Sequence, residues 1–429
     1  MMIKAYKYGW IILILIAVLA GCVQGEQNTA EAEKIKVMYV GKQSFYEQYG
    51  FAYMSQYPDA GIEVAVYPMI DNAGGNEREQ LEAFIEDQQP DVLLLNLNQY
   101  EELAAQGGLV SLSSYIQQDK YDIESIYPPL IKQLKEAGNG ELYGLSPTFA
   151  NAALFYNEDL FNEYGVEMPR DLMTWDEVLA LADRFAADAG HSGDRICGLS
   201  SDLFDSIASL LSVVGSSQNL SAVTPDAARV TIDSDSWRKV FQSVVPALEK
   251  GTISLVSEED LRNEDNDPFL AGRCAMSLNY KFKANQIMQS QSNLPHWGIV
   301  TAPIDANDRS NGAFITQNRI FAINANSQHP DAAWQLLKYL SSEEYARSRS
   351  QISDQELLAR IPSNVDDPLI APFYSFKTAH AVKDPMGPPE FQSELSSIIT
   401  FEVNEVLSGN KTLDDALVAI QNQAQGALK

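Results

Sequence analysis

The spacing of apolar and polar residues predicts strands and helices that follow one another along the chain. Residues 34–40 predict a strand, in which Ile35, Val37 and Tyr39 alternate with Lys36, Met38 and Val40, and residues 62–67 are rich in β-branched side chains. Residues 92–95 form a continuous apolar run, the pattern of a parallel strand that is covered on both faces. Apolar residues at helical spacing predict helices near 46–56 and over 99–106. This alternation indicates an α/β fold.

A capping box marks the start of a further helix near the middle of the chain. Thr174 and Glu177 stand three residues apart, so the Thr hydroxyl and the Glu carboxylate can each satisfy a free amide of the first helical turn. Apolar residues then recur at helical spacing from Trp175 to Phe185. An apolar run over 152–156 has the length of a strand and precedes this helix, so the α/β alternation continues.

The first residues predict export and a lipid anchor. Two lysines precede an apolar stretch over 9–20, which has the length of a signal-peptide core and is short for a bilayer span. The Leu-Ala-Gly-Cys sequence at 19–22 resembles a bacterial lipobox, so we expect removal of residues 1–21 and attachment of a diacylglycerol to Cys22. Residues 22–33 predict a flexible tether. The protein would then be lipid-anchored to the cell membrane, facing the extracellular side or the periplasm. The alternative is an uncleaved anchor with an incidental cysteine.

Net charge and length narrow the classes of partner and fold. The formal net charge is −28 and is spread along the chain, which disfavours nucleic acid and anionic lipid as partners. The charge favours solubility and gives no reason to expect an acidic ligand. At 429 residues the chain is too long for one ordinary core and fits two large lobes. No segment after the leader is long and apolar enough to predict a membrane span.

Motifs for catalysis or metal binding are missing from the sequence. The four histidines are scattered, with no H-E-x-x-H and no close Cys/His spacing. An acid-rich stretch over 258–267 lacks the glycine of an EF-hand loop. Neither a G-x-S-x-G elbow nor a phosphate-binding G-x-x-x-x-G-K-[ST] loop occurs. We therefore predict no catalytic residue, no metal site and no cofactor.

Several motifs in a fixed order resemble one protein family. The central motif, LYGLSP…ALFYNEDLFNEYG…P…TWDEV, runs from residue 142 to 178. FLAGRCAM at 269–276 is similar to a helix–turn–strand pattern F-x-x-G-(K/R)-x-A-M, and WGIV at 297–300 is similar to a strand pattern of the same family. Helical segments over 327–344 and 409–425 complete the series. Together these motifs resemble the family 1 extracellular solute-binding proteins, the sugar-capturing subunits of ABC importers.

The resemblance implies a two-lobed periplasmic-binding-protein-like fold of type II. Each lobe would be a mainly parallel sheet with helices on both faces. The chain would cross between the lobes three times, near 149–151, 308–312 and 350–358. The expected first lobe comprises 34–149 and 313–350, and the expected second lobe comprises 150–312 and 351–429.

The same resemblance implies binding without chemistry on the bound molecule. The lobes would close over a small molecule, expected to be a carbohydrate, and a monomer would deliver it to the transmembrane subunits of an ABC permease. Two other interpretations stay open. One is a lipid-anchored glycoside hydrolase, which needs two carboxylates facing each other across a cleft. The other is a sensor subunit of the same fold that presents its ligand to a membrane receptor.

Candidate ligand contacts are the polar and aromatic residues at strand ends and crossings, because the strands of open α/β sheets end at the binding cleft. Tyr280 is the foremost aromatic candidate, since the family often places a stacking ring after the strand that precedes it. A solvated loop, a turn or a hinge is the alternative role for the others, and Trp175 and Trp334 are expected in the core. The full set is Lys42, Gln43, Ser44, Asn96, Asn98, Phe149, Asn151, Asn279, Tyr280, Asn311 and Gly312.

Two of the three cysteines are left once Cys22 is assigned to the lipid. An exported setting permits a disulfide between Cys197 and Cys274. Cys274, however, stands where the resembled family has a small residue in a buried strand, so a buried free thiol is the favoured interpretation. A catalytic cysteine is not expected, because no histidine lies in a partner motif.

The lipobox generates the first prediction. Cys22→Ala should leave export possible and abolish lipidation, because residues 1–33 contain no other thiol. Partitioning of the expressed protein into the detergent phase measures the anchor. Unchanged partitioning of the variant would contradict the lipoprotein interpretation.

Overall fold

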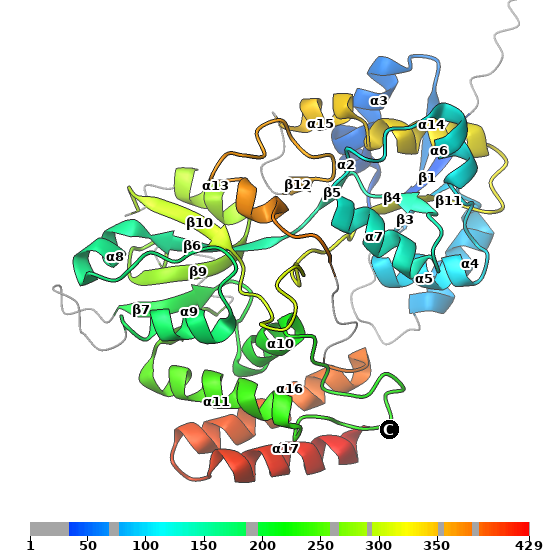
Figure 1. Ribbon diagram of the computed structural model, residues 1–429. Helices are drawn as coiled ribbons and strands as arrows, with labels where there is room; N and C mark the ends of the chain where they lie inside the picture. The colour runs from blue at the N-terminus through cyan, green and yellow to red at the C-terminus, as the bar shows by residue number, and fades with distance from the viewer. Residues whose placement is uncertain are drawn as a thin grey trace, which may run out of the picture.

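The protein has two lobes, each built around a five-stranded sheet (Figure 1). The computed structural model describes residues 34–67, 77–185, 196–257, 266–289, 294–350, 356–379 and 386–428. The predicted two-lobed α/β architecture is confirmed. Across these ranges, none of the helices combines the length and the apolar character that a membrane span requires.

The first lobe is defined here by the sheet with strand order β2-β1-β3-β11-β4. Strand β1 pairs in parallel with β2 and β3, whereas β11 runs antiparallel to β3 and β4. The strands are β1 (Lys34–Tyr39), β2 (Gly61–Val66), β3 (Val92–Leu95), β4 (Gly144–Leu145) and β11 (Ile320–Ile323). The helical segments are α2 (Lys42–Phe45), the π-helical η1 (Tyr46–Gly50), α3 (Phe51–Gln56), α4 (Glu77–Gln88), α5 (Leu97–Ala105), α6 (Ser113–Asp119), α7 (Pro128–Ala137), α14 (Pro330–Leu340) and α15 (Glu343–Ser350).

The second lobe is defined by the sheet with strand order β10-β6-β9-β7-β8. Strands β7, β8 and β9 are parallel, and β6 runs antiparallel to β9 and β10. Figure 1 shows α10, α11, α16 and α17 gathered on one side of this lobe. The strands are β6 (Ala152–Asn157), β7 (Cys197–Ser201), β8 (Ile253–Leu255), β9 (Cys274–Tyr280) and β10 (Trp297–Thr301). The helices are α8 (Glu158–Tyr164), α9 (Trp175–Ala182), α10 (Ile207–Ser217), α11 (Asp235–Lys250), α13 (Phe282–Gln289), α16 (Pro389–Leu407) and α17 (Leu413–Ala427).

The chain passes between the lobes at the carboxyl edges of both sheets, the edges at which the parallel strands end. In the first lobe, β11 begins at this edge, since Ile320 pairs with Leu95, the last residue of β3. In the second lobe, β6 begins there, since Ala152 pairs with Tyr280, the last residue of β9. Strand β10 ends at the same edge, with Thr301 opposite β6. The two carboxyl edges therefore both lie toward the junction of the lobes.

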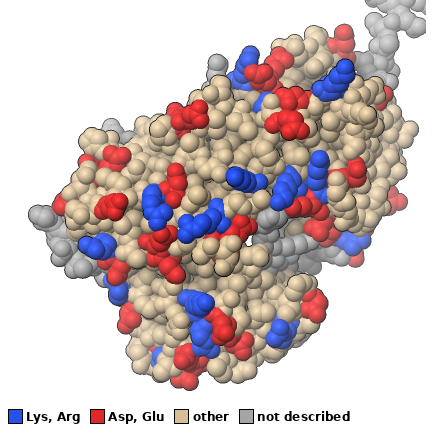
Figure 2. Space-filling view, in the orientation of Figure 1, with Lys and Arg blue, Asp and Glu red and all other residues tan. Residues whose placement is uncertain are grey.

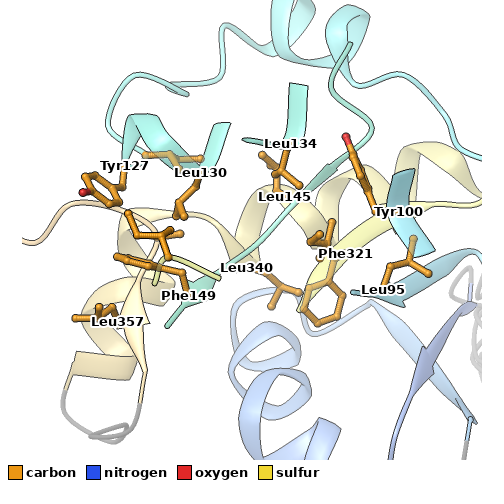
Figure 3. Packing of buried hydrophobic residues seen from close by; sticks show 14 of the residues in the cluster. Leu95, Tyr100, Tyr127, Leu130, Leu134, Leu145, Phe149, Phe321, Leu340 and Leu357 are labelled. Atoms are coloured by element: carbon orange, nitrogen blue, oxygen red, sulfur yellow. The ribbon is translucent and has the colours of Figure 1, made fainter. Parts of the chain in front are cut away.

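A small antiparallel sheet lies at this junction. It pairs β5 (Thr148–Phe149) with β12 (Leu357–Leu358), and the 3₁₀ segment η2 (Ala371–Tyr374) follows. Phe149 is buried and its ring contacts the rings of Tyr127 and Tyr374. Figure 3 shows Tyr127, Phe149 and Leu357 close together at one end of the buried cluster that continues into the first lobe.

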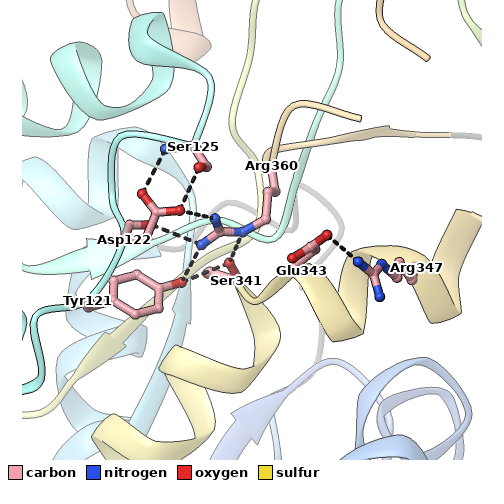
Figure 4. A network of polar contacts seen from close by, with 7 residues as sticks. All are labelled: Tyr121, Asp122, Ser125, Ser341, Glu343, Arg347 and Arg360. Atoms are coloured by element: carbon pink, nitrogen blue, oxygen red, sulfur yellow. Dashed lines mark hydrogen bonds and ion pairs between the residues drawn. The ribbon is translucent and has the colours of Figure 1, made fainter. Parts of the chain in front are cut away.

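Arg360 fastens the strand β12 to the first lobe (Figure 4). Its guanidinium donates to the carboxylate of Asp122 at 3.1 Å, to the Asp122 carbonyl at 3.0 Å and to the Ser341 carbonyl at 3.0 Å. The Tyr121 ring lies 5.8 Å from the guanidinium carbon. One side chain thus joins the segment after β12 to the end of α14 and to the loop before α7.

Local patterns predicted most of these elements well. The capping box at Thr174 is present, and the helix α9 buries Trp175 and Val178 as its spacing predicted. Trp334 is also buried, as expected. The helix predicted near 46–56 is preceded by a further helical turn, Lys42–Phe45. The Phe45 amide donates to the Gly41 carbonyl at 3.0 Å, and this first turn carries the Phe45 ring into the core.

The expectation of a free buried thiol at Cys274 is also wrong, because Cys274 forms a disulfide with Cys197. Strands β7 and β9 pair in parallel with these two residues in register, which brings their Cα atoms to 4.5 Å. The sequence did not show which strands are neighbours, so it did not show this pairing. The bond closes a loop with a sequence separation of 77 residues.

Replacing both cysteines, Cys197→Ala with Cys274→Ala, should lower the free energy of unfolding by about 2–4 kcal/mol, because the cross-link restricts the unfolded chain. Urea unfolding of the purified protein measures the change. Cys22→Ala alone is the matched control and should leave the stability unchanged. Equal stability of the double variant and the control would show that the disulfide does not form in solution.

Candidate ligand-binding site

The wall of the site on the first lobe includes the residues that follow β3. Asn96 caps α5: its Oδ1 accepts from the Gln99 amide at 2.9 Å, and its own amide donates to Gln99 Oε1 at 3.1 Å. Asn98 lies in the first turn of α5 and is exposed. Both residues are at the carboxyl edge, as predicted from the apolar strand before them. Contact of either with ligand stays a prediction.

A polar network that the sequence did not reveal lies at the same edge. Arg319 precedes β11, and its Nε is 3.4 Å from Glu356 Oε1. Another guanidinium nitrogen donates to Gln48 Oε1 at 2.7 Å, and the same oxygen accepts from the Tyr39 hydroxyl at 2.9 Å. Thr148 of β5 donates to Glu356 Oε2 at 2.7 Å. This network connects the edge of the first lobe to the junction and leaves about a third of the Arg319 side chain exposed.

The wall on the second lobe includes the ends of β7 and β9. Tyr280 is half-buried, packs against the buried residues of this lobe, and has a hydroxyl pKa raised by burial. Asn279 beside it is fully buried. Asp202, the residue after β7, lies 2.7 Å from the ammonium group of the buried Lys283. Burial raises the pKa of the Asp202 carboxyl, and the nearby Lys283 ammonium opposes this shift.

Three candidates lie on the short helix α2 of the first lobe. Lys42 and Gln43 are exposed, and Gln43 donates to Glu47 at 2.7 Å. Ser44 donates its hydroxyl to the Gly41 carbonyl at 3.0 Å. The three side chains follow β1 at the carboxyl edge, on the same side of the lobe as Asn96. Lys42 and Gln43 are the accessible members of this group.

The remaining candidates lie in the junction itself. Asn151 is buried and donates to the Phe373 carbonyl at 2.8 Å. Asn311 is also buried, and the Gly312 amide donates to the Thr378 carbonyl at 2.9 Å. A Cβ atom at Gly312 would lie 2.8 Å from the Phe376 ring, so this position requires glycine. With the buried Phe149, these residues hold the crossing segments together, and ligand contact by any of them stays a prediction.

Neither wall suggests a metal centre. Within the described ranges, no three or more His, Cys, Asp or Glu side chains are placed to hold a metal ion together. The polar groups of the two walls are instead hydrogen-bond donors and acceptors beside a half-buried aromatic ring. Such walls can form hydrogen bonds with a polar ligand and cover an apolar face of it.

Comparison with known proteins identifies the family. The sequence model of the bacterial extracellular solute-binding proteins matches residues 39–347. The chain belongs to this family.

Solved structures of solute-binding proteins have the same fold. The sugar-binding protein MalE from Xanthomonas citri matches with a TM-score of 0.68 and 21% identity, covering 92% of this chain and 97% of that chain. A substrate-binding protein from Listeria monocytogenes, in complex with cycloalternan, matches with a TM-score of 0.60 and 19% identity, covering 92% and 97%. At these identities the likeness shows the fold alone.

A relative by sequence is the sn-glycerol-3-phosphate-binding periplasmic protein UgpB from Brucella abortus. It is 25% identical over 257 residues, which cover 58% of this chain and 55% of the relative. The chain spans about half the length of the curated relatives it matches.

The capping role of Asn96 generates a prediction. Asn96→Ala should lower the free energy of unfolding by about 1 kcal/mol, because the Gln99 amide in the first turn of α5 loses its hydrogen-bond acceptor. Asn98→Ala, in the first turn of α5 and exposed, is the matched control and should change stability by less than about 0.5 kcal/mol. Urea unfolding measures both. Equal stability of the two variants would exclude Asn96 as the cap.

Proposed function

We propose that this solute-binding protein captures a carbohydrate between its two lobes and delivers it to the permease of an ABC importer. The observation that carries the proposal is the position of the two walls. Asn96 and Asn98 follow a strand of the first sheet. In the second sheet, Asp202 follows β7 and Tyr280 ends β9, and both carboxyl edges lie toward the junction. A ligand between the edges would contact both lobes.

The chemistry of the walls supports a carbohydrate as the ligand. A sugar presents hydroxyl groups that donate and accept hydrogen bonds, and C–H faces that pack against an aromatic ring. Asn98 and Gln43 are exposed amides on the first lobe, and Tyr280 offers a ring on the second. The structural neighbours include proteins solved with cycloalternan, maltose and D-mannitol, which supports the same ligand class.

Binding would be coupled to closure of the lobes. A ligand stabilises a closed form only through contacts that it makes better there than in the open form. The crossing segments at the junction, including the β5–β12 pair and the hydrogen bond between Gly312 and Thr378, would act as the hinge. The closed form would then dock on the permease. The predicted lipid anchor at Cys22, which lies outside the described residues, would hold the protein near that permease.

Surface charge supports a small soluble ligand over a polyelectrolyte partner. On the face shown in Figure 2, Lys and Arg are interspersed with Asp and Glu, and neither sign forms a large block. The whole chain carries a formal net charge of −28. Such a surface repels nucleic acid and anionic lipid and keeps the protein soluble at the membrane.

A thermal-shift screen over mono- and oligosaccharides tests the proposal. A ligand present at 100 times its Kd should stabilise the protein by about 2.7 kcal/mol. Recovery of the unchanged sugar after incubation with the protein separates binding from hydrolysis. Absence of any stabilising carbohydrate would contradict the proposal, and turnover of the sugar would favour the hydrolase alternative.

Tyr280→Ala should weaken carbohydrate binding by about 1–3 kcal/mol, because the ring at the end of β9 would cover a C–H face of the sugar. The variant should also be less stable, but only by part of the loss that follows truncation of a fully buried aromatic residue, which is about 3–5 kcal/mol. Calorimetric titration and thermal melting of one purified variant separate the two effects.

Tyr156→Ala is the matched control for this prediction. Tyr156 is also half-buried and packs against the same buried cluster, but it pairs with Met276, near the start of β9 and away from the carboxyl edge. It should lose stability and keep its affinity. Equal affinities of the two variants would remove Tyr280 from the site.

A further inference from the structure

A buried lysine is held between two carboxylates in the second lobe. The Lys283 side chain is fully buried, and its ammonium nitrogen lies 2.7 Å from Asp202 Oδ2 and 2.7 Å from Asp267 Oδ2. Two carboxylates and one ammonium leave one negative charge in excess. An excess charge inside a protein is costly unless hydrogen bonds satisfy it, so the environments of the two carboxylates decide where the excess lies.

The two carboxylates differ in their hydrogen bonds. Asp267 is fully satisfied, because its second oxygen accepts from the amides of Phe269 at 2.8 Å and Leu270 at 3.1 Å. The second oxygen of Asp202 has one long contact within the described chain, to Asn279 Nδ2 at 3.5 Å. Asp202 is therefore the carboxylate that carries the unsatisfied charge.

Asn279 is a second sign that a donor is missing from this position. It is fully buried, and in the described part of the chain its Oδ1 has no hydrogen-bond partner. Its Nδ2 donates to Ser277 at 2.7 Å and lies 3.5 Å from Asp202 Oδ1. Buried acceptors without donors are rare in folded proteins, and each one needs an explanation. Here an orphaned amide oxygen and an under-satisfied carboxylate lie side by side.

Asp202 lies at the edge of the second lobe that faces the first lobe. Asp202 follows Ser201, the last residue of β7, and so lies at the carboxyl edge that faces the junction. Its side chain keeps 11% of its surface exposed, whereas Lys283 is sealed and Asp267 keeps 7%. Asp202 is therefore the most exposed of the three charged side chains.

We propose that Asp202 determines ligand specificity: its Oδ1 accepts a hydrogen bond from a hydroxyl group of a neutral carbohydrate and disfavours anionic ligands such as sugar phosphates. Asn279 and Lys283 are positioning residues that orient the carboxylate. This inference rests on the proposed function and names the ligand class of the same site.

Electrostatics explain the discrimination. The charged groups that act on Asp202 are Lys283 of α13 and Asp267 of the turn before β9, and together the three carry one negative charge. On the opposite wall, the positive charge of Arg319 is paired with Glu356 and adds no net charge. A phosphate near Asp202 would meet this uncompensated charge, whereas a hydroxyl group would form a charge-assisted hydrogen bond.

The same carboxylate should reduce the stability of the protein. Burial raises the pKa of Asp202, with Lys283 opposing, so the ionised form is disfavoured in the folded protein relative to the unfolded chain. Carboxyl groups with a pKa perturbed by burial and a charged neighbour cluster at functional sites. Removing the charge of Asp202 should therefore stabilise the unliganded protein and weaken ligand binding.

The test compares Asp202→Asn with Asp267→Asn, because both residues contact Lys283 at the same distance. Calorimetric titration with a neutral sugar identified by thermal shift, and with its phosphorylated counterpart, measures affinity; thermal melting without ligand measures stability. Asp202→Asn should bind the neutral sugar at least ten-fold more weakly, discriminate less against the phosphorylated sugar, and melt at an unchanged or higher temperature. Asp267→Asn should melt lower and change affinity less than three-fold.

A pH series keeps the test decisive if Asp267→Asn does not fold. Wild-type affinity for the neutral sugar should fall as Asp202 becomes protonated at acidic pH, and Asp202→Asn should lose this dependence. Normal affinity of Asp202→Asn, or preference of the wild-type protein for the phosphorylated sugar, would overturn the inference and leave the proposed function standing. Failure of the wild-type protein to bind any carbohydrate would instead overturn the proposed function and, with it, the ligand class inferred here.

Discussion

The location of the candidate site depends on one constraint, which is that the chain enters and leaves its sheets at their carboxyl edges. Strand β11 begins beside the end of β3, and β6 begins beside the end of β9. The passage from β4 through β5 to β6 and the passage from β10 to β11 therefore each connect two carboxyl edges, and the loops that follow the parallel strands gather where the lobes meet. A binding site at such edges is the general outcome for open α/β sheets.

The junction combines rigid and polar parts in a way that suits a hinge. Phe149 and Arg360 fix β5 and β12 to the first lobe through buried contacts and hydrogen bonds. The Cys197–Cys274 bond holds β7 and β9 together at their starts, and the Asp202–Lys283–Asp267 group lies at the other end of the same strands. The second wall is thus supported at both ends, so a motion between lobes would leave its geometry intact.

Patterns along the chain predicted what depends on local physics. Strand β3, the α9 capping box and the buried Trp334 follow from apolar runs and helix-end chemistry within a few residues. What depended on contacts distant in sequence was missed. The Cys197–Cys274 bond requires knowing that β7 and β9 are neighbours, and the role of Asp202 requires Lys283 and Asp267 beside it. The position of Asn279 at a strand end predicts a ligand contact, whereas its burial depends on contacts distant in sequence.

Solution scattering with and without a saturating carbohydrate tests the central claim most directly, because that claim places the ligand between lobes that close on it. The account predicts that the radius of gyration of the protein decreases when the ligand is added, since closure brings the two sheets together. Asp202→Asn, examined at a ligand concentration that saturates it, should close to the same extent, because its second-wall geometry is preserved. An unchanged radius of gyration at saturation would contradict the account and indicate a ligand held by one lobe alone.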